Sequence, residues 1–205
     1  MVLKRGFDIL FSLYLIILLS PFLILISVLI KVDSKGPVIF KQQRLGKGGE
    51  EFTIFKYRTM VENAEDMGNG VFTLKDDPRI TRMGRFLRKT SLDELPQLFN
   101  ILKGDMSFVG PRPPVTYHPY EIDEYSEEQM QRFKVRPGVT GLAQLSGRKE
   151  LPWDERIEYD IEYIENYSFL YDIKLILMTV PKVLKMENNF NVKDQVDKHQ
   201  DKGDE

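Results

Sequence analysis

The feature that most constrains this chain is an uncharged, strongly apolar run near its N-terminus, from residue 9 to residue 30. As a straight helix, a run of this length would extend for roughly 30 Å, about the hydrocarbon thickness of a bilayer. A cleaved signal peptide fits less well, because no small-residue cleavage site follows and Lys31 and Asp33 come directly after the run. The run therefore predicts a membrane helix, whose simplest form is a single transmembrane anchor.

Two details of this segment favour a helix that enters the membrane and returns to the same face. Ser20 and Pro21 lie at the middle of the run, where proline removes a backbone hydrogen bond and serine can satisfy freed backbone groups. Both flanks are also basic, as cytoplasmic loops tend to be. These basic residues are Lys4, Arg5, Lys31, Lys35, Lys41 and Arg44. We therefore predict a re-entrant membrane helix with its flanks over residues 1–35, broken at Ser20 and Pro21.

The rest of the chain has the composition of one domain with a polar tail. Of the 205 residues, 42% are hydrophobic and 29% are charged, with a formal net charge of −2. The chain has no cysteine, which excludes disulfides and thiolate chemistry. Its two histidines, His118 and His199, argue against a histidine triad or a multi-histidine metal site. We expect a cytoplasmic catalytic domain over residues 36–185 and a disordered tail over 186–205.

Residue periodicity predicts an α+β domain that is mainly helical. Short strands at 38–40 and 52–58, joined by a glycine-rich turn at 46–49, predict a β-hairpin. Helices are expected over residues 77–88, 91–102, 121–134, 153–166 and 168–185, with a short strand or extended chain at 142–145. The last helix is strongly apolar but carries three lysines. Its pattern fits either a core helix or a helix at the membrane interface.

The adjacent carboxylates Asp93 and Glu94 follow Ser91 at the start of an expected helix. One interpretation is a capping box, in which Ser91 and Glu94 satisfy free backbone donors. The other is a phosphate-handling site, because two neighbouring carboxylates repel each other unless a cation neutralises them. Mg²⁺ suits such a pair, since it takes oxygen ligands and shares them with substrate phosphates. An ionised aspartate can also act as a nucleophile without a general base.

Several basic residues are candidates for binding phosphate. Arg112 lies between two prolines, and a rigidly placed arginine suits bidentate contact with phosphate. Arg136 and Arg148 carry the same two interpretations as Arg112, a phosphate ligand or a partner of a structural carboxylate. Lys56 and Arg58 alternate along one strand, a pattern more typical of a solvated face. Trp153 and the tyrosines at 159–171 are better explained by packing than by a sugar platform.

Taken together, these motifs resemble the bacterial sugar transferases, specifically the small monotopic phosphoglycosyl transferases. The resemblance covers residues 1–185, and its specificity comes from the order of the blocks. The blocks are Lys4-Arg5-x-x-Asp8, Ser20-Pro21, Gly36-Pro37-Val38-Ile39-Phe40-Lys41-Gln42-x-Arg44, Phe55-Lys56-Tyr57-Arg58-Thr59-Met60, Ser91-Leu92-Asp93-Glu94-Leu95-Pro96-Gln97-Leu98-x-Asn100, Gly104-Asp105-Met106-Ser107-x-Val109-Gly110-Pro111-Arg112-Pro113 and Arg136-Pro137-Gly138-x-Thr140-Gly141-x-Ala143-Gln144.

The resemblance implies transfer of a sugar-1-phosphate from a UDP-sugar to undecaprenyl phosphate, with release of UMP, as the first membrane step of glycan assembly. It implies that Asp93 carries the phosphosugar covalently and that Glu94 binds Mg²⁺. It implies that Arg88 and Arg112 lie near phosphate, with Lys56 as a weaker candidate. With the residues read from the sequence itself, the full set of candidate phosphate-binding residues is Arg88, Arg112, Lys56, Arg58, Arg136, Arg148 and Gln144. The resemblance gives Asp160 and Asp172 supporting roles. It also implies a monotopic protein on the cytoplasmic face of the inner membrane, with no nucleic acid partner and with a homodimer or downstream glycosyltransferases as expected partners.

Two other functions remain alternatives at this stage. A Leloir-type glycosyltransferase, which moves the sugar alone, would carry a nucleotide-binding α/β domain and an Asp-x-Asp metal site, and the sequence has neither. A non-catalytic membrane-anchored partner of a polysaccharide assembly complex would use Asp93 and Glu94 only to cap a helix. The segments 61–75 and 115–135 are the candidates for setting sugar selectivity.

Overall fold

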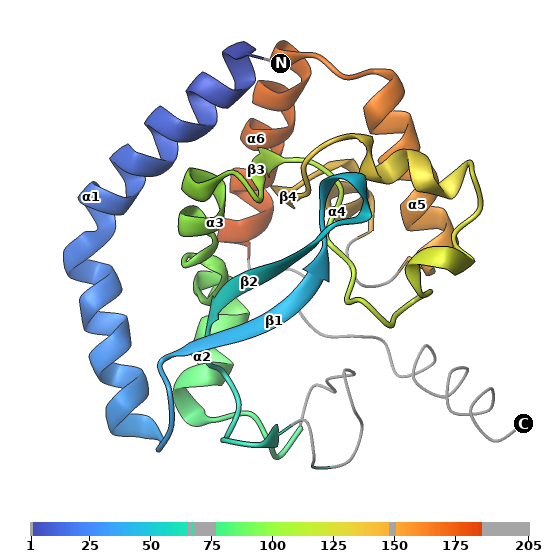
Figure 1. Cartoon of the computed structure of the whole chain (residues 1–205). Helices are drawn as coiled ribbons and strands as arrows, with labels where there is room; N and C mark the ends of the chain where they lie inside the picture. The colour runs from blue at the N-terminus through green and yellow to red at the C-terminus, as the bar shows by residue number, and fades with distance from the viewer. Residues whose placement is uncertain (1, 65–66, 68–76, 148–150, 186–205) are drawn as a thin grey trace, which may run out of the picture.

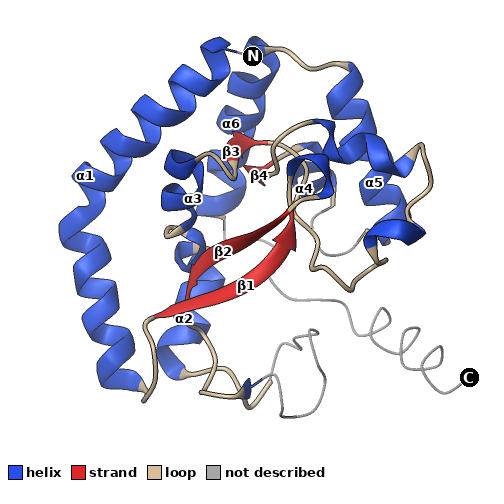
Figure 2. Cartoon of the chain, viewed as in Figure 1, coloured by secondary structure: helices blue, strands red, loops and turns tan. Residues whose placement is uncertain are grey.

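The computed structural model describes residues 2–64, 67, 77–147 and 151–185. It shows a mainly helical α+β fold with a long N-terminal helix along one side (Figures 1 and 2). The elements are α1 (Val2–Asp33), β1 (Ile39–Leu45), η1 (Lys47–Gly49), β2 (Glu51–Tyr57), α2 (Arg82–Thr90), η3 (Leu92–Glu94), α3 (Gln97–Lys103), β3 (Ser107–Val109), η4 (Ile122–Glu124), η5 (Gln129–Lys134), β4 (Gly138–Thr140), α4 (Leu142–Ser146), α5 (Trp153–Glu165) and α6 (Phe169–Leu184). Arg148, most of the 61–75 segment and the predicted disordered tail lie outside the described residues.

The predicted β-hairpin is confirmed. Strands β1 and β2 pair antiparallel, with Ile39 opposite Tyr57 and Leu45 opposite Glu51. The turn between them places Gly48 and Gly49 at φ values of 74° and 78°, which glycine adopts without the steric cost that other residues incur. The hairpin runs across the front of the molecule and carries Lys56 near the end of its second strand (Figure 2).

Helix α1 is continuous through Pro21, so the predicted break at Ser20 and Pro21 is wrong as a statement about secondary structure. Proline removes one hydrogen bond and bends a helix without necessarily ending it. The hydroxyl of Ser20 donates to the carbonyl of Ile17 at 2.8 Å, one turn earlier. Figure 1 shows the helix following a bowed path around the side of the domain.

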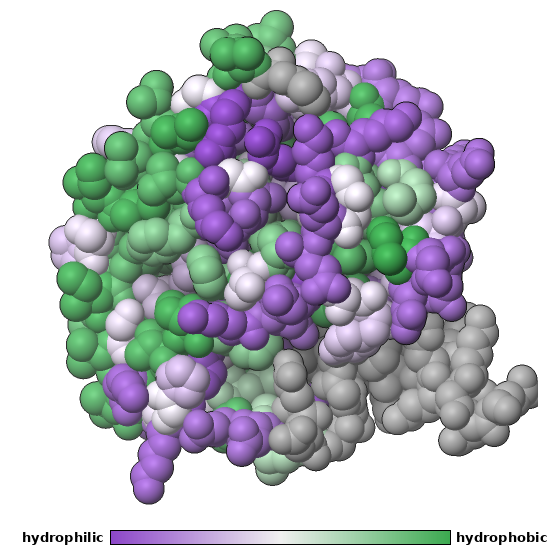
Figure 3. Space-filling view, in the orientation of Figure 1, coloured by the Kyte–Doolittle hydropathy of each residue, from purple (hydrophilic) through white to green (hydrophobic). Residues whose placement is uncertain are grey.

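The outer face of α1 is apolar and exposed. Within the described part of the chain it is the one helix long and apolar enough to cross a bilayer. Side chains such as Leu10 and Ile17 are 71% and 66% exposed. Figure 3 shows hydrophobic side chains gathered along the side of the molecule that α1 occupies. An apolar surface of this size is typical of contact with a membrane or a partner.

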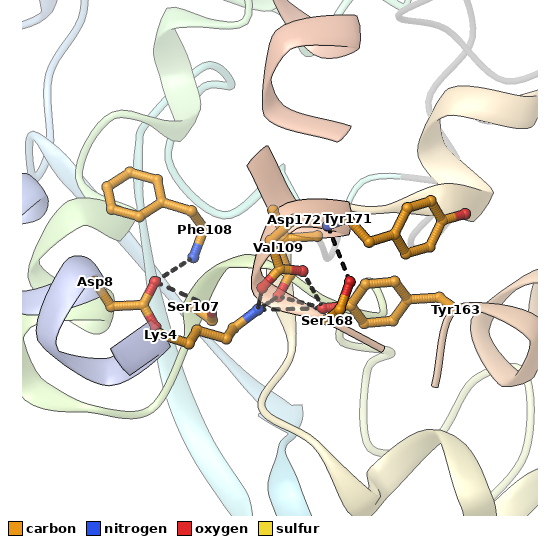
Figure 4. A network of polar contacts seen from close by, with 9 residues as sticks. All are labelled: Lys4, Asp8, Ser107, Phe108, Val109, Tyr163, Ser168, Tyr171 and Asp172. Atoms are coloured by element: carbon orange, nitrogen blue, oxygen red, sulfur yellow. Dashed lines mark hydrogen bonds and ion pairs between the residues drawn. The ribbon is translucent and has the colours of Figure 1, made fainter. Parts of the chain in front are cut away.

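Both ends of α1 are attached to the same domain. Near its C-terminal end, Ile26 and Ile30 are buried in a cluster with Tyr57 and Leu87. Asp33 then accepts a hydrogen bond from the backbone N–H of Met83 in α2, at 2.9 Å. The N-terminal end of α1 contacts β3 and α6 through charged side chains (Figure 4). The helix therefore lies against the domain at both ends.

Two of the predicted helix boundaries need correction around the paired carboxylates. Helix α2 begins at Arg82 rather than at residue 77, because the hydroxyl of Thr81 caps it by accepting from the N–H of Gly84. The expected helix over 91–102 is divided into the short turn η3 and the helix α3. Ser91 adopts a left-handed conformation (φ 58°) that ends α2 before η3, and Pro96, which has no backbone N–H to donate, lies between η3 and α3.

The region between β3 and α5 also differs from the prediction. The expected helix over 121–134 consists of two 3₁₀ segments, η4 and η5, and residues 142–145 form the short helix α4 rather than a strand. The extended chain lies just before α4, where β4 pairs in parallel with β3. The predicted helices over 153–166 and 168–185 are confirmed as α5 and α6. Helix α6 buries Leu175 in a core cluster but exposes Leu177 and Val180, so it has one core face and one exposed apolar face.

Candidate active site

The turn η3 presents Asp93 and Glu94 away from any helix cap. The Ser91 side chain makes no capping hydrogen bond to η3. The Glu94 side chain does not reach back to Ser91 and points instead toward two cations from other elements. The capping-box interpretation is therefore wrong for this segment.

The Glu94 carboxylate lies between a cation from the hairpin and a cation from the proline-rich loop. Lys56 Nζ in β2 donates to Glu94 Oε1 at 2.9 Å, and Arg112 Nη2 donates to the same oxygen at 3.0 Å. The side chains of Lys56 and Glu94 are 15% and 19% exposed, so the pair is largely removed from solvent. Lys56 therefore does not lie on a solvated face of the strand, as its alternation with Arg58 suggested.

The charges at this site keep Glu94 ionised. Burial by itself would raise the pKa of Glu94, but the charges of Lys56 and Arg112 outweigh burial and hold that pKa well below its usual range. Burial also lowers the pKa of Lys56, against the opposing effect of Glu94. The pKa of Arg112 is raised, chiefly by the charge of Glu94. Glu94 is thus kept as a carboxylate across the neutral pH range.

Asp93 lies beside Glu94 at the edge of the same cavity, whose volume is about 870 Å³. Arg88 in α2 lies on this side of the cavity, where its Nε donates to Thr59 Oγ1 at 2.8 Å. Burial lowers the pKa of Arg88, and the charge of Asp93 partly opposes this. The cavity therefore brings together five of the predicted site residues: Lys56, Arg88, Asp93, Glu94 and Arg112.

The Arg112 loop is fixed by close backbone packing. The N–H of Gly110 donates to the carbonyl of Thr140 at 2.9 Å, and the N–H of Gly138 donates to the carbonyl of Pro111 at 2.9 Å. A Cβ added to Gly138 would lie 2.1 Å from the nitrogen of Gly110, and one added to Gly141 would lie 2.3 Å from the oxygen of Gly110. Real Cβ atoms do not approach backbone atoms this closely, so the loop depends on the absence of side chains at these positions.

A buried ion pair also contacts the Arg112 loop. Arg132 in η5 pairs with Asp160 in α5 at 2.7 Å, and its Nη2 also donates to the backbone carbonyl of Arg112 at 3.0 Å. Burial raises the pKa of Asp160 to about 6, although Arg132 opposes the shift. Arg44 in β1 donates to the carbonyl of Pro113 at 3.1 Å. This places the predicted supporting residue Asp160 one contact away from Arg112.

Asp93 and Glu94 can hold Mg²⁺ only if the phosphates of the substrate complete the coordination of the ion. No group of three or more histidine, aspartate or glutamate side chains in the described residues could hold a metal without help. Mg²⁺ commonly binds through one or two carboxylates together with phosphates and water. Both cations on Glu94 contact Oε1, and among the described residues no hydrogen bond or ion pair reaches Oε2. Glu94 Oε2 and the Asp93 carboxylate are thus the two groups that would hold the ion.

The remaining predicted basic and amide residues have different surroundings. Arg58 is buried, and it donates to the carbonyls of Ser34 and Lys35 at the end of α1, which is an architectural contact. Arg136 donates to the carbonyl of Gly104 at 2.7 Å and does not line the cavity. Their phosphate-binding roles stay predictions.

Gln144 in α4 lines the cavity, as Arg58 does. Neither its amide nitrogen nor its amide oxygen has a hydrogen-bond partner in the described structure, although both atoms are buried. A buried amide without partners carries a free-energy penalty, which a bound ligand or water would remove. This position is compatible with the predicted substrate contact of Gln144.

Asp172 lies in a separate polar network at the N-terminal end of α1 (Figure 4). Its Oδ2 accepts from Lys4 Nζ at 2.7 Å, and its Oδ1 accepts from the hydroxyl of Tyr163 at 2.6 Å. Asp172 does not line the cavity, so its supporting role concerns the attachment of α1 to α6.

The sequence did not single out Arg132 or Arg156, both of which line the cavity. Arg156 stacks on the ring of Trp153 at 4.8 Å, and the indole N–H of Trp153 donates to His118 at 2.9 Å. Trp153 also lines the cavity, so its predicted role in packing rather than as a sugar platform stays a prediction. No local pattern marks Arg132, because its burial depends on Asp160, which is 28 residues away.

The structure combines one long, exposed apolar helix with a carboxylate and arginine site at a cavity, and comparisons with known proteins identify the family. The family model described as "Bacterial sugar transferase" matches residues 1–186. A protein named "Uncharacterized sugar transferase EpsL" from Bacillus subtilis (strain 168) is 43% identical over 187 residues, covering 91% of this chain and 90% of the relative. "Exopolysaccharide production protein PSS" from Rhizobium leguminosarum bv. phaseoli is 42% identical over 203 residues, covering 93% of this chain and 99% of the relative.

A larger relative carries a more specific name. "UDP-glucose:undecaprenyl-phosphate glucose-1-phosphate transferase" from Klebsiella pneumoniae is 46% identical over 189 residues, covering 89% of this chain but only 40% of the relative. The chain therefore belongs to the bacterial sugar transferase family, and it is a transferase.

Proposed function

We propose that this protein transfers a sugar-1-phosphate from a UDP-sugar to undecaprenyl phosphate, with release of UMP, through a covalent intermediate on Asp93. The observation that carries the proposal is the position of Glu94 between Lys56 and Arg112, with Asp93 beside it at the cavity. These residues are unlike a helix cap and resemble a site built to hold a diphosphate. The name of the relative from Klebsiella pneumoniae, a UDP-glucose:undecaprenyl-phosphate glucose-1-phosphate transferase, supports the proposal.

The reaction requires two exchanges at one phosphorus atom. In the first, an Asp93 carboxylate oxygen forms a bond to the phosphorus that carries the sugar, and the bond from that phosphorus to the oxygen bridging to UMP breaks. In the second, a phosphate oxygen of undecaprenyl phosphate attacks the same phosphorus, and the bond to Asp93 breaks. No general base is needed, because both nucleophiles are already anions.

The protein's contribution is positioning and charge stabilisation. Arg112 and Lys56 are held within hydrogen-bonding distance of Glu94, where they can also face the phosphate oxygens of the donor. Arg88 lies on the same wall, where its charge interacts with that of Asp93. Mg²⁺, when bound at Asp93 and Glu94, would supply neutralisation of the diphosphate charge. The fixed loop keeps the Arg112 guanidinium in place during both exchanges.

The first experiment is a measurement of UMP release from a panel of UDP-sugars, with undecaprenyl phosphate and Mg²⁺, by purified protein in nanodiscs. We expect UMP from at least one donor, no UMP in the presence of EDTA, and a loss of at least about 1,000-fold in Asp93→Asn. Asparagine keeps the shape and the hydrogen-bonding capacity of the residue but removes the nucleophile.

The outcomes separate the alternative functions. Release of UDP instead of UMP would indicate a Leloir-type enzyme. Full turnover by Asp93→Asn would contradict the covalent mechanism. No release from any donor, together with normal complementation of a deletion strain by Asp93→Asn, would support the non-catalytic alternative.

We further propose that α1 is re-entrant, so that the protein is monotopic on the cytoplasmic face of the inner membrane. The support is that both ends of α1 are bound to one domain, through Asp33 at one end and Lys4 at the other. A helix that crossed the bilayer would have its ends on opposite sides. Because the chain has no native cysteine, Val2→Cys and Lys35→Cys can be labelled singly. Both should resist a membrane-impermeant thiol reagent on intact cells, and labelling of Val2→Cys alone would restore the transmembrane anchor.

A further inference from the structure

The N-terminal end of α1 contacts the strand that leads directly to Arg112. Lys4 Nζ donates to the backbone carbonyl of Val109, the last residue of β3, at 2.7 Å. The same nitrogen pairs with Asp172 Oδ2 at 2.7 Å, and the two side chains are only 13% and 4% exposed. Lys4 therefore joins β3 to α6 across the end of α1 (Figure 4).

A second charged residue, one turn further along α1, holds the other two residues of β3. Asp8 Oδ1 accepts from the hydroxyl of Ser107 at 3.1 Å and from the backbone N–H of Phe108 at 3.2 Å. Asp8 is only 2% exposed. Together with the contact from Lys4, every residue of β3 is bound by a side chain of α1.

The link from β3 to Arg112 is short and stiff. Only Gly110 and Pro111 separate Val109 from Arg112. Gly110 is packed against the backbone of the β4 segment, and Pro111 has a fixed φ. A shift of β3 would therefore be carried to Arg112 rather than absorbed by the intervening chain.

The two sides of the Arg112 loop are held by different side chains. Arg132 and Arg44 bind carbonyls at and after Arg112, and both come from the domain itself. On the side before Arg112, β3 pairs with β4 of the domain and is bound in addition by Lys4 and Asp8 of α1.

We propose that Lys4 and Asp8 are positioning residues for the transfer reaction, which set the location of Arg112 against Glu94 by holding β3. They touch neither the cavity nor the reacting groups, so their effect on the reaction passes through Arg112. The activity part of this inference rests on the proposed function. Its structural part does not.

The first test measures backbone hydrogen exchange of the full chain in nanodiscs, and it needs no substrate. Lys4→Met is compared with Arg5→Met, which removes one positive charge from the same end of α1. Arg5 donates to the carbonyls of Ile101 and Leu102 in α3, not to β3. We expect amides in residues 107–112 to exchange at least about threefold faster in Lys4→Met and at the wild-type rate in Arg5→Met. Equal exchange in the two variants would overturn the proposal.

Substitutions of Asp8 give an independent test in case the Lys4→Met variant fails to fold. Asp8→Asn keeps an oxygen that can accept from Ser107 and Phe108, whereas Asp8→Leu does not. Exchange over residues 107–112 should stay close to wild type in Asp8→Asn and rise in Asp8→Leu. A rise in both, or in neither, would contradict a role that depends on these hydrogen bonds.

The second test is a double-mutant cycle on UMP release. We expect Lys4→Met to lower kcat by about tenfold when Arg112 is present, because a small misplacement of a catalytic group is costly. In an Arg112→Met background, the same change should lower kcat by about twofold or less, because coupled residues are not additive. Arg5→Met should act by the same factor in both backgrounds.

A Lys4→Met effect of the same size with and without Arg112 would show that Lys4 acts on stability or topology alone, and it would overturn the proposal. A wild-type protein that releases no UMP would instead count against the proposed function. The exchange comparison would still decide whether α1 positions the Arg112 loop.

Discussion

Glu94 and Asp160 are both acidic residues withdrawn from solvent and paired with arginine, yet their pKa values shift in opposite directions. Glu94 contacts two cations, and its pKa lies well below its usual range. Asp160 contacts Arg132, and burial raises its pKa to about 6. The distances are similar, at 3.0 Å for Arg112 with Glu94 and 2.7 Å for Arg132 with Asp160.

The difference lies in the direct contacts: Glu94 is hydrogen-bonded to two cations, whereas Asp160 is hydrogen-bonded to Arg132 and is influenced by Arg156 only through its charge. Burial penalises the ionised form of both residues. A second cation reverses that effect at Glu94. Glu94 at the cavity therefore stays ionised, whereas the pair of Arg132 and Asp160 serves to hold the Arg112 loop in place.

The largest expected effect follows from removing the cation of Asp160. Arg132→Met should lower the free energy of unfolding by about 3–5 kcal/mol, because one charge of a buried pair is left without its partner. Denaturant unfolding in detergent measures this. The double variant Arg132→Met with Asp160→Leu should recover most of the loss. A single variant as stable as wild type would show that Asp160 is already neutral at the working pH.

Removing one of the two cations at Glu94 should affect activity more than stability. Arg112→Met should reduce kcat for UMP release by about 100-fold, the effect typical of losing one preorganised donor at developing charge. Lys103→Met is the matched control, because Lys103 is an exposed partner of Asp105 and is 65% exposed. The control should remain within about twofold of wild type, since surface ion pairs contribute little. Equal losses in both variants would argue against a specific role of Arg112.

The smallest expected effect is a change in the pH dependence of stability, and it tests whether the pKa of Asp160 is raised. Because its pKa is raised in the folded protein, its stabilising contribution is complete below the unfolded pKa of 3.8 and is lost as the pH rises through about 6. Wild type should therefore lose stability relative to Asp160→Asn between about pH 4 and 7, with a slope of no more than about 1.4 kcal/mol per pH unit. Parallel pH profiles would show that the pKa of Asp160 is not raised. Comparing the two proteins removes the opposite contribution of Glu94.

Much of the fold could be predicted from the sequence where structure depends on local periodicity. The hairpin, α5 and α6 follow from alternation, glycine turns and helical spacing. The prediction failed where a distant contact overrides local preference. Residues 121–134 have a helical composition, but Phe133 is buried with Leu45 of the hairpin and the chain adopts two short 3₁₀ turns instead.

The candidate site shows the same division. Asp93, Glu94 and Arg112 were identified from their motifs, and the structure brings all three to one cavity. Whether Ser91 caps a helix was decided by its left-handed backbone, which no motif specifies. The burial of Lys56 could not be predicted either, because it depends on Glu94, 38 residues further along the chain.

The backbone packing around Arg112 has a consequence for engineering this protein. Gly110, Gly138 and Gly141 leave no room for a side chain, since an added Cβ would overlap backbone atoms at each of them. A mutant library that randomises these positions would yield misfolded protein before it yielded a new specificity. Diversity is better placed at the α4 and α5 walls of the cavity, beginning with Gln144, where the amide can be exchanged without moving the loop that carries Arg112.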